Sequence, residues 1–107
     1  MAREQFQNLT EPMYYILISL LSERCGVDIM KTVLEISNGR VKVGPGTLYT
    51  LLGRFEEEKL IIETSREGRR RNYKITEKGK EILNEEYKRL KTLVLEGREF
   101  LEDIYEE

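Results

Sequence analysis

The residues of this chain best suited to chemistry form one cluster of basic side chains. The segment TSREGRRRNYKIT, residues 64–76, has a single acid, Glu67, among Arg66, Arg69, Arg70, Arg71 and Lys74. Guanidinium groups stay charged and match the geometry of phosphate oxygens, so the cluster is suited to bind nucleic acid. Charge runs are also often ordinary solvated surface, and the rest of the sequence has to separate these two interpretations.

The residue inventory argues against catalysis. The chain contains no histidine, which is the commonest general base and metal ligand, so its single cysteine lacks the usual activating partner. The glycines of VGPGTLY, residues 43–49, lack the Lys-Ser/Thr ending of a phosphate-binding loop. We therefore expect neither an enzyme nor a metal site or cofactor. For Cys25, a redox role and a small buried hydrophobe both remain open.

Composition is that of one globular domain. The chain has 107 residues, of which 39% are hydrophobic and 36% charged. Its longest apolar run, YYILISLL at residues 14–21, is far too short to cross a bilayer. The first residues lack a charged segment followed by an apolar one, so we expect no secretion signal. One cysteine cannot form an internal disulfide, so we expect a cytoplasmic protein. A core of this size is modest, and association with a second copy would stabilise it.

Apolar spacing predicts three helices in the first half of the chain. The first covers about residues 10–24, with Thr10 as N-cap and Met13, Ile16, Leu17, Leu20 and Leu21 on its apolar face. The second covers residues 28–37, capped by Asp28, with Ile29, Val33 and Ile36 facing inward, and stops at Asn38-Gly39. The third begins near Pro45 to Thr47 and buries Leu48, Leu51, Leu52 and Phe55.

The second half predicts a hairpin and a last helix. The β-rich runs LIIETS, residues 60–65, and RNYKI, residues 71–75, flank a turn that we expect at Glu67-Gly68. Thr76 is the expected N-cap of the final helix. This order predicts a mainly α fold with a small β-hairpin, the winged helix-turn-helix, in which the third helix enters the major groove. We expect residues 1–75 to form the DNA-binding domain and residues 76–107 a C-terminal dimerisation helix.

Charge is distributed as DNA binding requires. Residues 1–74 carry twelve Lys and Arg and ten Asp and Glu, a net charge of +2, whereas residues 75–107 carry six and ten, a net charge of −4. The third helix repeats this polarity, because its trailing end carries Glu56, Glu57 and Glu58. We expect its leading end to approach DNA, although Tyr49 could instead belong to the core. The predicted DNA-binding residues are Lys42, Thr47, Tyr49, Thr50, Arg54, Arg66, Arg69, Arg70 and Arg71.

Two segments resemble the PadR family of bacterial transcriptional regulators. They are GPGTLYTLLGRFEEEKLI, residues 44–61, and GRRRNYKITEKGKEIL, residues 68–83, and the similarity extends over roughly residues 10–105. The resemblance implies a dimeric repressor, usually ligand-responsive, with a single C-terminal helix. Two positions depart from the family pattern: Gly26-Val27 stands where many relatives have Gly-Tyr, and Thr50 where a proline often follows the tyrosine.

The last helix independently predicts a dimer. Apolar residues recur four and three positions apart, which is a heptad seam, and they are Leu83, Tyr87, Leu90, Val94, Gly97, Leu101 and Ile104. A helix reaching from Thr76 to Glu106 projects beyond its small domain, so part of the seam needs a second chain to cover it. Two copies related by a two-fold axis would recognise an inverted repeat with half-sites roughly ten base pairs apart, or a multiple of that.

Ligand sensing is the least defined expectation. By the family's arrangement, Tyr14 or Tyr15 near Leu90 and Val94 could line a pocket for a small aromatic or drug-like effector, although aromatics at such spacing more often fill a core. The predicted function is a DNA-binding transcriptional repressor. The alternative is a winged helix used for protein-protein contact, which would bind duplex weakly and without salt dependence.

Overall fold

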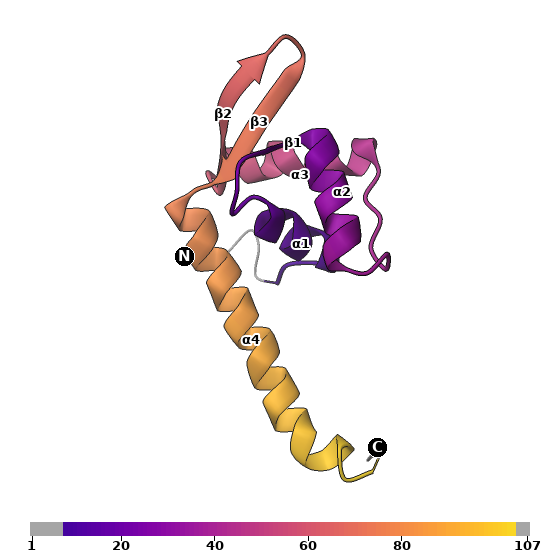
Figure 1. Cartoon of the computed structure of the whole chain (residues 1–107). Helices are drawn as coiled ribbons and strands as arrows, with labels where there is room; N and C mark the ends of the chain where they lie inside the picture. The colour runs from indigo at the N-terminus through magenta and orange to yellow at the C-terminus, as the bar shows by residue number, and fades with distance from the viewer. Residues whose placement is uncertain (1–7, 105–107) are drawn as a thin grey trace.

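The fold is the predicted winged helix with a long C-terminal helix. A computed structural model describes residues 8–104. A helical body carries the hairpin on one side and the projecting last helix on the opposite side (Figure 1). The elements are α1 (Glu11–Ser19), β1 (Arg24–Cys25), α2 (Gly26–Ile36), α3 (Pro45–Glu57), β2 (Ile61–Glu67), β3 (Arg70–Ile75) and α4 (Glu77–Leu101). The predicted fold class, mainly α with a small sheet, is confirmed.

Helix α1 begins where predicted but ends early. The Thr10 hydroxyl accepts a hydrogen bond from the amide of Met13 at 3.3 Å, which confirms the N-cap. The helix stops at Ser19 rather than near residue 24. The Ser19 carbonyl accepts from the Arg24 guanidinium at 2.7 Å, and the Leu20 carbonyl accepts from the amide of Ile75 at 2.9 Å. Because these carbonyls bond to other elements, the chain leaves the helix there.

Because α1 ends early, its apolar face is shorter than predicted. Leu21 was expected on that face together with Leu20. Leu20 is fully buried, but Leu21 lies past the helix end and is exposed, so this part of the prediction was wrong. The helical period no longer applies beyond residue 20, and Leu21 points away from the core.

A short strand that the sequence did not predict changes the start of α2. Strand β1 pairs antiparallel with β3, matching Arg24 with Tyr73 and Cys25 with Asn72, and completes a sheet of order β1-β3-β2. Leaving this strand, the chain enters α2 at Gly26, so Cys25 occupies the N-cap position and the prediction of Asp28 as the cap was wrong. The Cys25 thiol donates a hydrogen bond of 3.4 Å to the carboxylate of Asp28 in the first turn.

The end of α2 corrects one inward-facing residue. Ile29 and Val33 are fully buried as predicted, whereas Ile36 is exposed. The inward position one turn after Val33 belongs to Ser37, whose hydroxyl donates to the Val33 carbonyl at 2.9 Å. It also accepts from the Val41 amide at 3.0 Å, so the buried hydroxyl ties the helix end to the following loop. The predicted stop is confirmed, since Asn38 and Gly39 both have positive φ, at 53° and 81°.

One core joins the three helices, the sheet and the beginning of α4. Leu48, Leu52 and Phe55 of α3 are almost fully buried as predicted, while Leu51 is half-buried at the edge of the core. Tyr73 and Ile75 of β3 reach the same core, together with Ile82 of α4. This packing fixes the base of the hairpin and the leading end of α3 relative to each other.

The hairpin, here called the wing (residues 61–75), turns one residue later than predicted. Strands β2 and β3 reach Glu67 and Arg70, which face each other, so the turn is Gly68-Arg69 and not Glu67-Gly68. Gly68 has φ +61°, a conformation for which glycine is favoured, which explains its place in the turn. Thr64 is an extra residue between the pairs formed by Glu63 and Ser65, which makes a β-bulge.

Helix α4 has 25 residues and spans roughly 37 Å at 1.5 Å per residue. Thr76 caps it, accepting from the Gly79 amide at 3.0 Å. Only its first turns pack against the body, and the rest projects freely (Figure 1). The helix ends at Leu101, so Ile104 lies beyond it, contrary to the prediction; residues 105 and 106, which that prediction included, lie outside the described residues.

Candidate nucleic-acid interface

The leading end of α3 is an exposed polar surface. Pro45 occupies the first turn, and Gly44 at the N-cap offers no side chain to the first amides. The side chains predicted to contact DNA at this end are all exposed, and they are Lys42, Thr47, Tyr49 and Thr50. Because the apolar residues of the helix face the core, these side chains point away from it. Free amides at a helix start favour anionic groups such as phosphate.

Tyr49 is a surface residue that lies over the start of α2. Its side chain is 48% exposed, so the alternative that it belongs to the core was wrong. A methyl group on Gly26 would collide with the Tyr49 hydroxyl, so only a glycine leaves room for the ring in this position. The ring lines a groove of about 460 Å³ between α2, α3 and the wing, whose other lining residues are Cys25, Gly26, Val27, Asp28, Arg69, Arg70 and Arg71.

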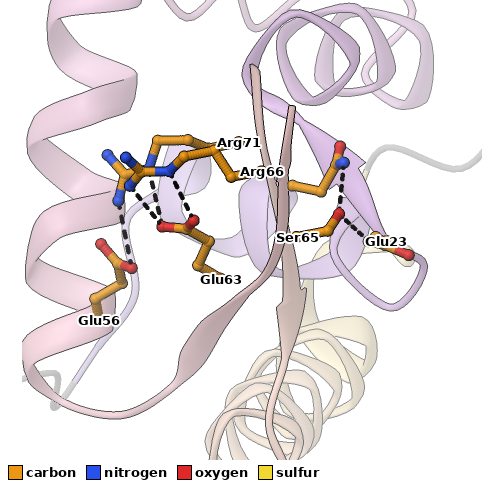
Figure 2. A network of polar contacts seen from close by, with 7 residues as sticks. Glu23, Glu56, Glu63, Ser65, Arg66 and Arg71 are labelled. Carbon is orange, nitrogen blue, oxygen red and sulfur yellow. Dashed lines mark hydrogen bonds and ion pairs between the residues drawn. The ribbon is translucent and has the colours of Figure 1, made fainter. Parts of the chain in front are cut away.

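The wing arginines differ in how far their charges are engaged. Figure 2 shows Arg66 and Arg71 converging on the carboxylate of Glu63. Arg71 also lies 3.8 Å from a carboxylate oxygen of Glu56 on α3. Arg70 forms one ion pair, at 3.6 Å, with Asp28 at the start of α2.

Arg69 occupies the turn itself. Within residues 8–104 it forms neither a hydrogen bond nor an ion pair with another side chain, and it is exposed. The predicted basic cluster therefore consists of a tip with an available charge and an adjoining strand pair, Arg66 and Arg71, whose charges are held by acids. Lys74, further along β3, is exposed as well.

The contacts of the wing arginines shift the pKa values of two neighbouring side chains, Glu63 and Tyr73. The hydrogen bond from Arg66 is the largest cause that lowers the pKa of the Glu63 carboxyl; burial opposes it, and the hydrogen bond from Arg71 lowers the pKa further. The Arg71 guanidinium lies 5.4 Å from the centroid of the Tyr73 ring, a cation-π contact. Burial raises the pKa of the Tyr73 hydroxyl, and the charge of Arg71 opposes that effect. Arg71 therefore contacts two acids and a ring, and its side chain is 38% exposed.

A second set of polar contacts fixes the other face of the wing. Glu23, in the loop after α1, accepts a hydrogen bond from the Ser65 hydroxyl (Figure 2). It also accepts one from the hydroxyl of Thr64 at the bulge. Asn72 of β3 donates to the Ser65 hydroxyl at 3.0 Å. The middle of the wing is thus held from two sides. Sequence reasoning missed Glu23 and Glu63, because one acid in a charged chain carries no signal of its long-range partner.

Arg54 and the acids after it occupy the trailing part of α3. Arg54 is exposed in the last turn of the helix, and Glu57 is exposed beside it. Glu56 faces the wing through its ion pair with Arg71. The polarity predicted for α3, with acids away from its leading end, is therefore present in the folded chain.

The predicted seam on α4 is largely uncovered. Leu83 is buried in the core, and Leu90 and Gly97 are half-buried. Val94 is 68% exposed, and the remaining seam residues, Tyr87, Leu101 and Ile104, are exposed too. Leu93 and Phe100, which the heptad did not include, extend the same exposed stripe on one side.

Two hollows lie where α1 meets α4. The larger, about 460 Å³, is lined by Tyr14, Ile18, Leu21, Lys80, Leu83, Asn84 and Tyr87. The smaller, about 180 Å³, is lined by Leu9, Thr10, Glu11, Tyr14, Tyr15, Glu86 and Leu90. Of the predicted pocket residues, the structure thus brings Tyr14, Tyr15 and Leu90 together, while Val94 lines neither hollow. Burial is the largest cause that raises the pKa of the Tyr14 hydroxyl.

Glu86 is a buried charge that the sequence did not single out. Its side chain is 1% exposed, and Arg89 donates two hydrogen bonds to it, at 3.1 and 2.7 Å. These bonds raise the pKa of the Arg89 guanidinium. The pair places a fixed polar group beside the apolar wall of the smaller hollow.

Two features that would indicate other functions are absent from the described chain. Across residues 8–104, no group of three or more Cys, His, Asp or Glu side chains is arranged to hold a metal ion. In the same part of the chain, no helix has both the length and the apolar character needed to cross a membrane.

Three helices, an antiparallel wing and a polar leading end of α3 define the class of winged helix regulators. The sequence profile of the Transcriptional regulator PadR-like family matches residues 16–85, more than half of the chain. The chain therefore belongs to the PadR-like family. It is a transcriptional regulator that acts by binding DNA and is not an enzyme.

Solved structures share this fold. RosR of H. salinarum has a TM-score of 0.70 and 23% identity, over 98% of this chain and 94% of that one. A transcriptional regulator from Clostridium thermocellum has a TM-score of 0.69 and 22% identity, over 85% and 94%. A PadR-like transcription factor from Bacteroides fragilis has a TM-score of 0.62 and 29% identity, over 78% and 81%. No curated protein matches the sequence significantly.

Proposed function

We propose that this protein is a dimeric repressor that binds an inverted-repeat operator in the cytoplasm. One observation supports the proposal most directly: the wing, with exposed Arg69 and Arg70 at its tip, and α4, with the uncovered apolar stripe, project from opposite sides of one small body (Figure 1). DNA binding needs the first surface and pairing of two copies needs the second, so the two do not compete for space. Residues 1–75 would supply DNA binding, and residues 76–107 dimerisation.

The DNA contact combines base recognition with backbone contact. Thr47, Tyr49 and Thr50 are exposed at the leading end of α3, where side chains of a recognition helix reach base edges. The wing tip, with Arg69 and Arg70, supplies charge for phosphate. Lys42, just before α3, and Arg54, in the last turn of α3, are exposed and would add phosphate contacts. Phosphate contacts position the protein, whereas base contacts give specificity.

Dimerisation follows from the uncovered part of α4. An isolated helix with exposed Val94, Phe100 and Leu101 leaves apolar area in water that a second copy can cover. Half-buried Gly97 has open space around it: the nearest atom to a methyl group placed there would be a Leu101 methyl carbon, at 3.7 Å. Two helices can therefore approach closely at this point. Two recognition helices would then lie about 34 Å apart, one turn of duplex.

An effector site would couple these two parts. The larger hollow between α1 and α4 has an apolar wall that includes Tyr14, Leu83 and Tyr87, and it opens beside the dimer stripe. A flat aromatic molecule bound there would contact α4 where the helix leaves the body. Such a ligand shifts the equilibrium between two dimer geometries only if it binds one geometry more tightly than the other. We propose that ligand binding changes the spacing of the two recognition helices and releases the operator.

The test compares Val94→Glu with Thr92→Glu on the same helix. Both residues are exposed and both changes add one charge, but residue 92 lies on the face opposite the stripe. Light scattering should show a dimer for the wild type and for Thr92→Glu and a monomer for Val94→Glu. The monomer should lose specific operator binding, by roughly 10³-fold or more, and keep weak nonspecific binding. A dimeric Val94→Glu, or a wild type that binds one half-site as tightly as the inverted repeat, would contradict the proposal.

A further inference from the structure

We propose that Glu63 controls the specificity of DNA binding by withholding Arg66 and Arg71 from phosphate, so that the wing contacts the backbone only with its tip. This inference rests on the proposed DNA binding and deepens it. It assigns a function to an acid in the middle of a basic wing, where simple charge attraction to DNA would favour a neutral residue.

The geometry around Glu63 engages both of its oxygens. Arg66 donates from Nε to Oε2 at 3.1 Å and from a terminal nitrogen to Oε1 at 3.2 Å, a two-pronged contact. Arg71 donates from Nε to Oε1 at 3.0 Å. One carboxylate therefore orients two guanidinium groups, as Figure 2 shows. Charge-assisted, two-pronged contacts of this kind are the stronger and more directional ones among surface pairs.

Arg71 is held from a second side by the recognition helix. A terminal nitrogen lies 3.8 Å from Glu56 of α3, and the guanidinium stacks near Tyr73. Its charge thus points toward the acidic trailing end of α3, the part of that helix that duplex phosphates would repel. Arg71 therefore connects the wing to α3 and has little freedom to reach DNA. This reassigns a residue predicted to bind phosphate as one that fixes the angle of the wing.

The wing tip makes fewer contacts. Arg69 is exposed in the turn and has no side-chain partner within the described part of the chain. Arg70 has a single contact of 3.6 Å with Asp28, and both side chains are about half exposed. Weak, exposed pairs of this kind exchange readily for phosphate. The wing therefore presents charge at its tip and neutralises charge on the strand pair next to the tip, Arg66 and Arg71.

The consequence for specificity follows from what phosphate contacts do. Each added phosphate contact strengthens binding to every duplex alike and steepens the dependence of log affinity on log salt by about 0.9. It carries no sequence information. Two freed arginines would therefore raise nonspecific binding more than they raise the preference for an operator. Glu63, like an ordinary glutamate, is ionised in the neutral range, and its lowered pKa extends its ability to hold the two arginines to more acidic pH.

The experiment compares Glu63→Gln with Glu67→Gln in the full chain. Both acids lie on β2 and both changes remove one negative charge, but Glu67 forms no side-chain ion pair in residues 8–104. Affinities for a random-sequence duplex and for a selected operator are measured between low and moderate salt. Glu63→Gln should steepen the salt slope by about one to two ions and reduce the ratio of specific to nonspecific affinity. Glu67→Gln should change the slope less than half as much.

The same comparison in a variant without the two arginines tests whether they cause the change in salt slope. When Arg66 and Arg71 are both alanine, Glu63→Gln should change the salt slope no more than Glu67→Gln does. If Glu63→Gln and Glu67→Gln change the salt slope equally, Glu63 acts only through its negative charge, and the inference is overturned. Weaker binding by Glu63→Gln would overturn it as well, because Glu63 would then orient the arginines toward phosphate. A wild type that binds no duplex at any salt concentration would instead contradict the proposed function, so the two failures are distinguishable.

Discussion

Two glycines in helices should respond to alanine with opposite signs. Gly79 lies in the first turn of α4 and is buried against the chain that enters the wing. A methyl group there would overlap the backbone carbonyl oxygen of Leu60 and lie 2.6 Å from a side-chain carbon of Ile75. The Leu60 carbonyl also accepts from the amide of Thr76 at 2.9 Å, so it cannot move without weakening that bond. Gly53, in the interior of α3, has no atom within 4 Å of such a methyl.

The expected magnitudes follow from these surroundings. Alanine at an open position in a helix interior is favoured over glycine by about 1 kcal/mol, so Gly53→Ala should stabilise the protein by about that amount. Overpacking costs about 1–3 kcal/mol, and Gly79→Ala should fall at the upper end because the obstacle is backbone. The two variants should therefore differ in free energy of unfolding by about 3–4 kcal/mol.

Urea denaturation followed by far-ultraviolet circular dichroism measures this difference. Protein concentration has to be equal for both variants, because a dimer's stability depends on it. The midpoint should rise for Gly53→Ala and fall for Gly79→Ala, with little change in the slope against urea. If Gly79→Ala is neutral or stabilising, the close approach of α4 to Leu60 is not as described.

Three further outcomes are expected. Thr76→Ala removes the cap of α4 and a hydrogen bond of 2.7 Å to the Lys59 carbonyl, and should lower the free energy of unfolding in urea by about 1–2 kcal/mol. Gly26→Ala should force the Tyr49 ring to rotate and weaken operator binding by about 1 kcal/mol or more, with a smaller change for random duplex in the same titration. A carboxyl carbon NMR titration should find the pKa of Glu63 below its ordinary 4.5. Its ion pairs should therefore contribute stability above that pH and lose it as pH falls through the lowered pKa.

Local patterns were sufficient to predict most of the fold. Buried Leu48, Leu52 and Phe55 follow the helical period. The side chains of Thr10 and Thr76 cap α1 and α4 by accepting hydrogen bonds from amides three residues later. These features depend on neighbours a few residues away, so the sequence contains the information directly. Family membership was predicted from two short motifs in the same way, and the profile match confirms it.

What the sequence did not predict depends on distant partners. Strand β1 has only two residues, and it exists because Arg24 and Cys25 pair with β3 almost fifty residues later. That pairing moved the start of α2, and the Leu20 carbonyl that bonds Ile75 ended α1 early. For the candidate site, the sequence predicted the basic wing and the leading end of α3 as the surface for DNA. It could not show that Glu63 engages part of that charge, since the ion pair depends on the register of the hairpin.

The most direct test of the account is selection of bound sequences from random duplex DNA by the wild-type protein. A dimer with recognition helices on α3 should enrich an inverted repeat whose half-site centres are roughly ten base pairs apart, or a multiple of that. Substitution of Tyr49 should weaken that enrichment while binding to random duplex persists. Selection that yields no enriched sequence, or only a single half-site, would contradict the proposal of a dimeric operator-binding regulator.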